Sequence, residues 1–444
     1  MKRIAFRIIA LCVIAGVSRE AEATSNFEQY WSKWRGPLAT GVAPMASPPI
    51  EWDENRNVRW KVEIPGKGLS SPIVWGETVF VTSAVETEKR GQPKREVPRR
   101  RRRGPPGITT TSIHKFVIFA ISRRDGSILW QRTVREELPH EGTHPSGSWA
   151  SNSPVTDGEH IYFGFGSRGL YCFDMQGNKK WETDLGDMTI RLGFGEGSSP
   201  VMYGEFIVVN WDHEGQSFIV ALDKKTGREA WRVNREERTS WSTPLVVAHG
   251  GKSQVITSAT HRTRSYDLAT GNLIWECSGM TLNAIPTPVA AGGVVYVTSG
   301  FRGNALQAIR LEGAKGNITD TDAIVWELDR DTPYVPSPLL YGDRLYLLKR
   351  NDGILSCFNA GTGEVHYGPR RLPGIMEAYA SPVGADGRIY IVGRNGTTLV
   401  VKDGPMFEVL SQNVLDDGFD ASPAVVGKEL YLRGRKHLYC IAAN

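Results

Sequence analysis

A serine-proline or threonine-proline pair recurs eight times along this 444-residue chain, and each pair opens a short apolar run. The hydroxyl residues of the pairs are Ser71, Ser153, Ser199, Thr243, Thr287, Ser337, Ser381 and Ser422. Six of the seven intervals between them measure 41 to 50 residues, and the first measures 82. A period in the low forties is the length of one four-stranded β-propeller blade. The repeat therefore overrules the expectation of about three domains that chain length alone would give.

Each repeat contains the same succession of strand signals. After Ser199 come apolar, β-branched runs at residues 206–210 and 218–223, and then a glycine-containing turn leads into a strand with Trp231. In five repeats an aromatic residue follows the turn glycine by four positions: Gly126 and Trp130, Gly177 and Trp181, Gly227 and Trp231, Gly271 and Trp275, and Gly363 and Tyr367. We expect these aromatics to pack between blades, because one blade is too thin to bury its own apolar face.

The two ends of the chain complement one another. The last repeat stops at Asn444 after three strands, whereas Trp60 lies in a strand that precedes the first serine-proline pair. We therefore predict an all-β fold: an eight-bladed β-propeller of four-stranded antiparallel blades, formed by residues 57–444 as a single domain. Pairing of residues 58–62 with residues 438–441 would close the ring and remove an exposed strand edge.

The first 23 residues have the features of a secretory signal peptide. Lys2 and Arg3 precede an apolar run, and Ala21-Glu22-Ala23 is a small-residue cleavage pattern. The apolar run is shorter than the roughly 20 residues that span a bilayer, which favours cleavage over retention as an anchor. We expect an exported protein, periplasmic or extracellular, with residues 24–56 as a lead-in segment and no transmembrane segment after cleavage.

The long first interval predicts a basic, disordered insertion at about residues 86–113 in the first blade. It contains five consecutive arginines: Arg99, Arg100, Arg101, Arg102 and Arg103. Like charges repel and bury no apolar surface, so the run is either a solvated loop or a tether for an anionic polymer, lipid head group or acidic protein. This insertion and the signal account for the net charge of +5 and leave about −3 elsewhere. The composition therefore does not indicate a general nucleic-acid-binding surface.

Two groups of side chains are candidates for a functional site. Six aromatics lie just before serine-proline strands, on the face formed by the connections between blades: Trp149, Phe194, Trp241, Tyr334, Tyr379 and Phe419. They either form a binding mouth at the central channel or cap the channel by packing on one another. The sequence Asp212-His213-Glu214 could hold a metal or transfer protons, or it could be a polar turn after a strand.

The repeat resembles the tryptophan-docking motif of the pyrroloquinoline-quinone-like (PQQ-like) β-propeller family. The resemblance rests on Leu-Tyr-Cys-Phe-Asp at 170–174, Ile-Val-Ala-Leu-Asp at 219–223, the threonine-glycine turns and the tryptophans that follow. It covers residues 57–444, and the lead-in sequence at 31–37 is similar to that of exported bacterial members. The family includes quinone-dependent alcohol and sugar dehydrogenases. It also includes cofactor-free scaffolds such as the propeller lipoprotein of the outer-membrane assembly complex.

The resemblance implies a choice between these two classes. The enzymes hold their quinone beneath two adjacent cysteines and beside a calcium ion, and no two cysteines are adjacent here. We therefore predict an exported, monomeric scaffold that binds a protein or envelope component on its loop-rich face, without catalysis or a cofactor. The alternative is an oxidoreductase of alcohols or sugars that requires PQQ and calcium. A third interpretation is recognition of a carbohydrate or another small molecule at the channel mouth.

Overall fold

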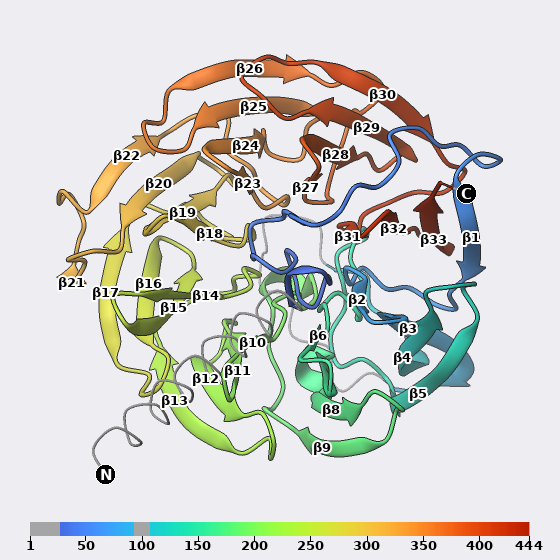
Figure 1. Ribbon diagram of the computed structural model, residues 1–444. Helices are drawn as coiled ribbons and strands as arrows, with labels where there is room; N and C mark the ends of the chain where they lie inside the picture. The colour runs from blue at the N-terminus through green and yellow to red at the C-terminus, as the bar shows by residue number, and fades with distance from the viewer. Residues whose placement is uncertain (1–26, 93–106, 444) are drawn as a thin grey trace, which may run out of the picture.

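Eight β-sheets surround a central axis in the computed structural model, which describes residues 27–92 and 107–443 (Figure 1). Helical structure in these residues is confined to residues 27 and 28 and to two short 3-10 turns, η1 (Gly166–Arg168) and η2 (Arg191–Gly193). No helix of the described segments is long and apolar enough to cross a membrane. The predicted all-β, eight-bladed propeller is therefore confirmed.

In seven of the blades the four main strands run in sequence order from the central channel to the outer rim, and in the eighth blade the N-terminal strand takes the outermost place. The first four blades contain β2 (Ile73–Trp75), β3 (Thr78–Arg90), β4 (Ser112–Ser122) and β5 (Ile128–Glu137); β6 (Val155–Thr156), β7 (His160–Gly164), β8 (Leu170–Asp174) and β9 (Lys179–Thr183); β10 (Val201–Tyr203), β11 (Phe206–Trp211), β12 (Ser217–Asp223) and β13 (Glu229–Arg235); β14 (Leu245–His249), β15 (Lys252–Ser258), β16 (Arg262–Asp267) and β17 (Leu273–Ser278). A short strand, β21 (Gly316–Asn317), pairs in parallel with the outer edge of β17.

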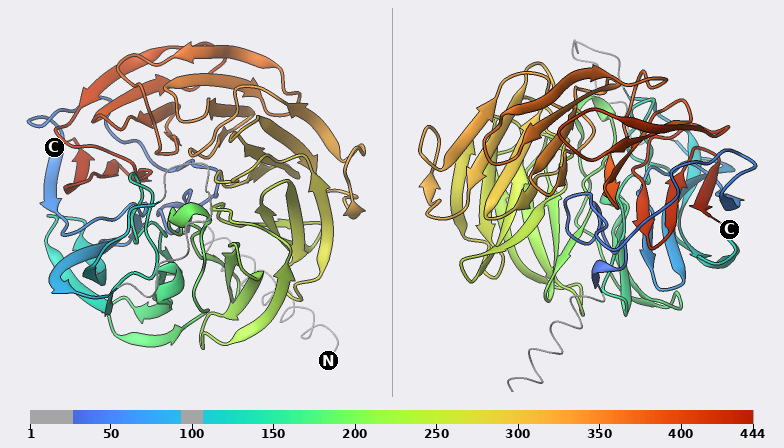
Figure 2. Two further views of the ribbon diagram at one scale, coloured as in Figure 1. Left: turned by 180° about the vertical axis from the view of Figure 1, so that it is seen from behind. Right: turned by 45° about the horizontal axis from the view of Figure 1, so that its top comes forward.

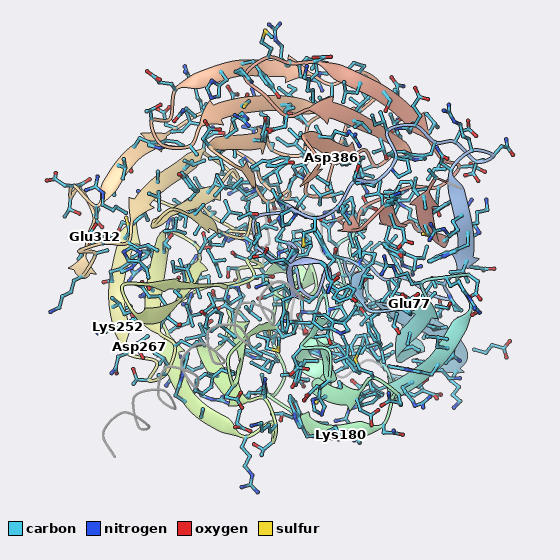
Figure 3. All side chains as sticks on the ribbon, in the orientation of Figure 1. Glu77, Lys180, Lys252, Asp267, Glu312 and Asp386 are labelled. Carbon is cyan, nitrogen blue, oxygen red and sulfur yellow. The ribbon has the colours of Figure 1, made fainter. Side chains whose placement is uncertain are left out.

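The other four blades repeat this arrangement. They contain β18 (Val289–Ala291), β19 (Val294–Ser299), β20 (Ala305–Arg310) and β22 (Ile324–Leu328); β23 (Leu339–Tyr341), β24 (Arg344–Leu348), β25 (Ile354–Asn359) and β26 (Val365–Arg371); β27 (Val383–Ala385), β28 (Arg388–Val392), β29 (Thr397–Lys402) and β30 (Val409–Val414); β31 (Ala424–Val426), β32 (Glu429–Arg433), β33 (His437–Ala442) and β1 (Val58–Glu63). Glu312 and Lys180 are exposed at the outer rim (Figure 3). Charged rims of this kind discourage edge-to-edge association of strands.

The eighth blade joins the two ends of the chain. Strand β1 pairs antiparallel with β33, with Trp60 opposite Cys440 and Val62 opposite Leu438. The predicted closure is confirmed, and it places the Trp60 side chain, which is only 8% exposed, against the first blade. There its indole N–H donates to the carbonyl oxygen of Arg123 over 2.9 Å.

The repeated tryptophans pack on the turn glycine of the next blade. At Gly227 (φ +68°) a Cβ atom would lie 2.6 Å from the Trp181 ring, so only glycine allows this approach. Equivalent contacts join Trp60 to Gly126, Trp130 to Gly177, Trp231 to Gly271 and Trp326 to Gly363. Each of these five indoles also donates to a backbone carbonyl in the next blade. The aromatic spacing in the sequence therefore encodes contacts between blades, as predicted.

The serine-proline repeat has a structural role of its own. Backbone N–H groups donate to the hydroxyl of the equivalent residue in the next blade over 2.9–3.0 Å, as from Ser153 to Ser199 and from Ser381 to Ser422. The Ser71 hydroxyl donates to the carbonyl of Ser422 over 2.8 Å and so links the last blade to the first. These bonds form a ring of hydroxyl groups around the channel.

The lead-in segment crosses the centre of one face (Figure 1). Backbone N–H groups of Val74 and Thr156 donate to the carbonyls of Trp31 and Ser32 over 2.9 Å, and Gly384 donates to Gly41 over 2.9 Å. The Trp34 indole donates to the Thr287 hydroxyl over 2.8 Å. The lead-in therefore covers the channel on this face, and the connections between blades lie on the other face (Figure 2, left).

The boundaries predicted for the basic insertion were wrong at both ends. Strand β3 continues to Arg90 and β4 begins at Ser112, with Glu86 opposite His114 and Arg90 opposite Ser112. Residues 86–90 and 112–113 thus belong to a paired hairpin, because the ladder continues past the apolar core into charged residues. The predicted disorder of Arg99 to Arg103 concerns residues outside those that the structure describes.

Candidate functional site

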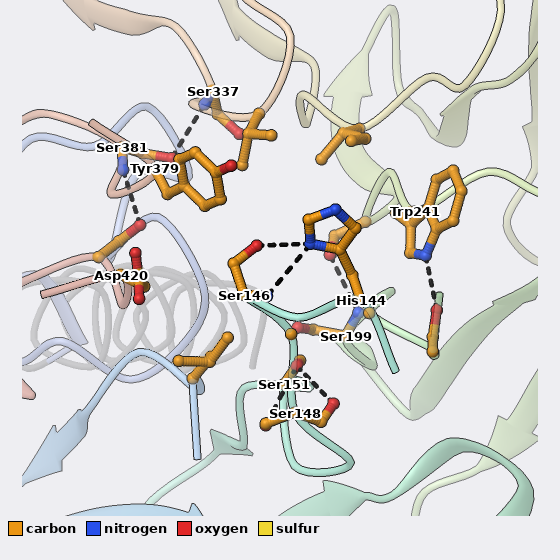
Figure 4. Close-up of a pocket in the computed structure, with 18 of the residues that line it drawn as sticks. His144, Ser146, Ser148, Ser151, Ser199, Trp241, Ser337, Tyr379, Ser381 and Asp420 are labelled. Carbon is orange, nitrogen blue, oxygen red and sulfur yellow. Dashed lines mark hydrogen bonds between the residues drawn. The ribbon is translucent and has the colours of Figure 1, made fainter. Parts of the chain in front are cut away.

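A cavity of about 280 Å³ occupies the channel on the face of the inter-blade connections (Figure 4). Seven of the eight repeat hydroxyl residues line it: Ser153, Ser199, Thr243, Thr287, Ser337, Ser381 and Ser422. Trp34 also lines this cavity, so the lead-in segment limits it toward the opposite face. The cavity is thus a pocket with a hydroxyl-lined wall rather than an open tunnel.

Aromatic rings from several loops form its sides. Phe194, Trp241, Tyr334 and Tyr379 all line the cavity, and Figure 4 shows Trp241 and Tyr379 on opposite sides of His144. The Trp241 indole donates to the carbonyl of Gly195 over 2.7 Å, which fixes the orientation of its ring.

Two of these rings, those of Tyr379 and Tyr334, each pack against another side chain on one face. Tyr379 has the Arg394 guanidinium 4.1 Å from its ring centroid. Tyr334 stacks on Phe301 with the ring centroids 5.0 Å apart. The supported rings are therefore held in place before any ligand arrives.

His144 projects between the aromatic walls with a defined hydrogen-bonding pattern. Its Nδ1 accepts the backbone N–H of Ser146 over 3.2 Å and lies 2.6 Å from the Ser146 hydroxyl. Burial, together with the nearby charges of Arg394 and Lys67, lowers the pKa of His144 below its ordinary value of 6.5. The imidazole is therefore neutral at pH 7 with its proton on Nε2, which is available to donate.

The charged side chains of the cavity are already paired. Asp420 accepts hydrogen bonds from Arg394 over 2.5 Å and from Arg435 over 3.1 and 3.2 Å. Glu196 accepts from the backbone N–H and hydroxyl of Ser167 over 2.7 and 2.5 Å. Within residues 27–92 and 107–443, no lysine or arginine lines the cavity.

The six aromatics predicted at the mouth divide into three groups. Four of them line the cavity, as described above. Trp149 contributes to a smaller adjacent cavity, where its indole donates to the carbonyl of Glu141 over 2.9 Å. Phe419 is fully buried, with its ring 5.8 Å from that of Tyr439, and does not reach the cavity. The structure therefore combines the two predicted alternatives, a mouth and internal packing.

The side chains of Asp212, His213 and Glu214 do not converge on one point. Asp212 and Arg235 form an ion pair over 2.9 Å, with side chains 0% and 1% exposed. His213 accepts the Thr189 N–H at Nδ1 and contacts the carbonyl of Gln216 at Nε2, over 3.0 and 3.1 Å. Glu214 accepts the Thr239 hydroxyl over 2.8 Å. Each polar group is thus engaged in holding a loop.

A second buried carboxyl group, that of Glu237, lies near the Asp212 network. Glu237 forms an ion pair with Arg264 and has only 2% of its side chain exposed. Burial and the charge of Asp212 raise the pKa of Glu237 to about 7, although Arg235 and Arg264 act in the opposite direction. A raised folded-state pKa stabilises the fold at low pH and loses that contribution as pH rises through about 7.

We therefore expect the free energy of unfolding to fall by about 1–3 kcal/mol between pH 5 and pH 8 through Glu237 alone. Urea unfolding across this pH range measures the effect. In Glu237→Gln the fall in the free energy of unfolding between pH 5 and pH 8 should be smaller by this amount, whatever the absolute stability of the variant. Parallel pH profiles of the two proteins would contradict the assignment.

The arginine run Arg99 to Arg103 lies outside the described residues, so its role as a tether stays a prediction. The chain is described again from Gly107, whose N–H donates to the carbonyl of Leu192 over 2.8 Å. Ile108 and Thr143 exchange backbone hydrogen bonds of 2.7 and 3.0 Å. This part of the insertion therefore packs against the loops that carry His144 and Phe194.

Sequence reasoning missed several contributors to the cavity, among them His144, Asp420 and Trp34. His144 and Asp420 lie in inter-blade connections with no repeat to mark them, and Trp34 belongs to the lead-in segment. The sequence showed the hydroxyl residues as a repeat, but it did not predict that their side chains line the channel.

Comparison with known proteins gives the family. A family model described as outer membrane protein assembly factor BamB matches residues 114–278 and 215–444. The chain belongs to this family. The BamB of Yersinia pestis is 23% identical over 339 residues, which cover 72% of this chain and 78% of that protein. The predicted resemblance to PQQ-like propellers of the BamB type is confirmed.

The BamB-like chain is also similar to other propellers. The crystal structure of BamB from Moraxella catarrhalis superposes with a TM-score of 0.54 and 14% identity, covering 76% of this chain and 95% of that one. The polyvinylalcohol dehydrogenase of Sphingopyxis sp. (strain 113P3) is 28% identical over 198 residues. That match covers 37% of this chain and 30% of the dehydrogenase. The structural similarity at this level of identity concerns the fold.

Proposed function

We propose that this protein is an exported, non-catalytic scaffold that binds a protein of the cell envelope on its loop face, the face onto which the central cavity opens. The observation that carries the proposal is the match to the BamB family over residues 114–278 and 215–444. The relative in Yersinia pestis is named an outer membrane protein assembly factor. By analogy, we propose a partner in an envelope assembly complex and a periplasmic location.

The loop face has the properties of a protein-binding surface. Met376 lies in the connection between β26 and β27 and Arg302 in the loop between β19 and β20, both on this face, and both side chains are exposed, Met376 by 71%. The Arg302 guanidinium lies 5.4 Å from the centroid of the Phe301 ring. Methionine, arginine and aromatic side chains are enriched at protein interfaces, because they bury a large area in a rigid setting.

The second candidate, a quinone-dependent oxidoreductase, is favoured by the similarity to polyvinylalcohol dehydrogenase. The residues of the cavity do not fit the quinone. PQQ carries several carboxylates, and burying them without a cation is costly; no lysine or arginine is among the described residues that line the cavity. Groups of three or more side chains able to hold a metal ion are also absent from the described part of the chain. We derive no oxidation chemistry for this site.

Affinity capture from the native cell envelope tests the scaffold proposal. We expect the mature protein to retain one envelope protein in near-stoichiometric amount. The double substitution Met376→Glu, Arg302→Glu should reduce its recovery at least about tenfold, because it places two negative charges in the contact.

The matched control is Met45→Glu on the lead-in segment, whose side chain is 61% exposed on the opposite face. This variant should recover the partner as efficiently as the unaltered protein. Equal loss in both variants, or recovery unaffected by either, would contradict a partner on the loop face.

A further inference from the structure

We propose that the central cavity binds a single uncharged pyranose unit of a saccharide. This goes beyond the proposed function, because a sugar inside the channel and a protein on the loop face are separate ligands. The two proposals can therefore fail independently. The argument rests on the charge, the aromatic walls, the hydrogen-bonding groups and the size of the cavity.

The charge of the lining favours a neutral ligand. The acidic groups there, Asp420 and Glu196, are already bound by arginines or by Ser167, and His144 is neutral. With no lysine or arginine among the lining residues that the structure describes, a buried anion would find no counterion. A buried cation would have to compete with Arg394 and Arg435 for Asp420. An uncharged ligand avoids both costs.

The aromatic walls suit the apolar faces of a sugar ring. Tyr379 and Trp241 lie on opposite sides of the pocket (Figure 4), and Tyr334 adds a third ring. Arg394 covers one face of Tyr379 and Phe301 covers one face of Tyr334, and both tyrosines line the cavity, so a ligand there would stack on the opposite face of each ring. The axial C–H groups of a pyranose pack on such aromatic faces, while its hydroxyls project from the ring edge.

The polar groups between these walls match the ring edge of a sugar. A hydroxyl of the serine-threonine ring, such as that of Ser199 or Ser381, accepts one backbone N–H and keeps its own proton to donate. His144 offers Nε2–H, and the amide of Asn351 accepts at its oxygen from Val335 and keeps its N–H groups. Hydroxyls that both donate and accept are the partners that a polyol needs.

The size and closure of the cavity set the length of the ligand. Its volume of about 280 Å³ lies just below the range for small-molecule sites, which is about 300–1,000 Å³. Trp34, fixed by its bond to Thr287, limits the end toward the lead-in segment. One pyranose would fill the pocket, and a longer chain would leave it through the loop face.

Titration of the mature protein with D-glucose, D-galactose and N-acetyl-D-glucosamine tests the inference, with binding measured by calorimetry and ligand-observed NMR. We expect at least one of these sugars to bind saturably with a Kd of about 1 mM, as is usual for a small ligand with few contacts. Tyr379→Ala and Trp241→Ala should each weaken binding about tenfold.

Conservative and remote substitutions separate binding from folding. Tyr379→Phe keeps the ring and should bind within about twofold of the unaltered protein. Tyr203→Ala removes a half-buried tyrosine outside this cavity and should leave binding unchanged, with thermal unfolding confirming that each variant is folded. The inference is overturned if no uncharged sugar saturates the protein by about 20 mM. It is also overturned if binding survives both alanine variants, or if D-glucuronate or PQQ binds more tightly.

Discussion

A chain that lacks residues 24–64 is expected to unfold at a far lower temperature than one that lacks only residues 24–56. Both variants lose the lead-in segment, and only the longer deletion removes β1 from the eighth blade. That strand carries Trp60, which is buried against the first blade and bonded to Arg123. Loss of a buried tryptophan alone costs about 3–5 kcal/mol, a large part of the 5–15 kcal/mol that stabilises a typical protein.

The deletion also exposes a strand edge. Removing β1 leaves the backbone groups on the outer edge of β33 unpaired and deprives Glu429 of its ion pair with Arg59. Differential scanning calorimetry of the two variants measures the difference, and we expect the longer deletion to lose its cooperative transition or to aggregate. Transitions of equal temperature and sharpness would show that the ring does not depend on this closure.

Asp212→Ala is expected to destabilise the protein by about 3–5 kcal/mol, the second large effect. The substitution leaves the Arg235 guanidinium buried without its carboxylate, and side-chain burial at this pair is nearly complete. The Thr257 hydroxyl and Tyr266, which accept from Arg235 over 2.7 and 2.9 Å, cannot neutralise its charge. Urea unfolding measures the loss.

The double variant Asp212→Asn, Arg235→Met provides the control. It removes both charges and keeps similar volumes, so it should recover most of the stability lost in Asp212→Ala. Partner capture should be unaffected in every variant that folds, because the side chains of Asp212 and Arg235 are buried and cannot touch a partner. An Asp212→Ala protein as stable as the parent would contradict a structural role for this ion pair.

The propeller was predictable because its repeat reports pairing directly. Each tryptophan four residues after a turn glycine marks an outer strand, and the unpaired Trp60 marked the strand that closes the ring. These local signals recur because every blade packs against its neighbour in the same way. The ends of the hairpin β3–β4 were missed, since its charged residues up to Arg90 remain paired without apolar alternation.

The candidate site was less predictable, because the connections between blades do not repeat. Phe194 and Phe419 both precede serine-proline strands, yet Phe194 lines the cavity while Phe419 is fully buried. An isolated β-bridge between Phe419 and Gly434 pairs the loop that carries Phe419 with the eighth blade. His144 carried no signal, because its position depends on the bond to Ser146 and on loops from other blades.

Site-specific photo-cross-linking in the native host tests the central claim, a protein partner on the loop face, most directly. A photoreactive phenylalanine would replace either Met376 on the loop face or Met45 on the lead-in segment, both exposed methionines. We predict one protein adduct of constant size from position 376 on irradiation, and none from position 45. An adduct from position 45 with none from position 376 would contradict the account.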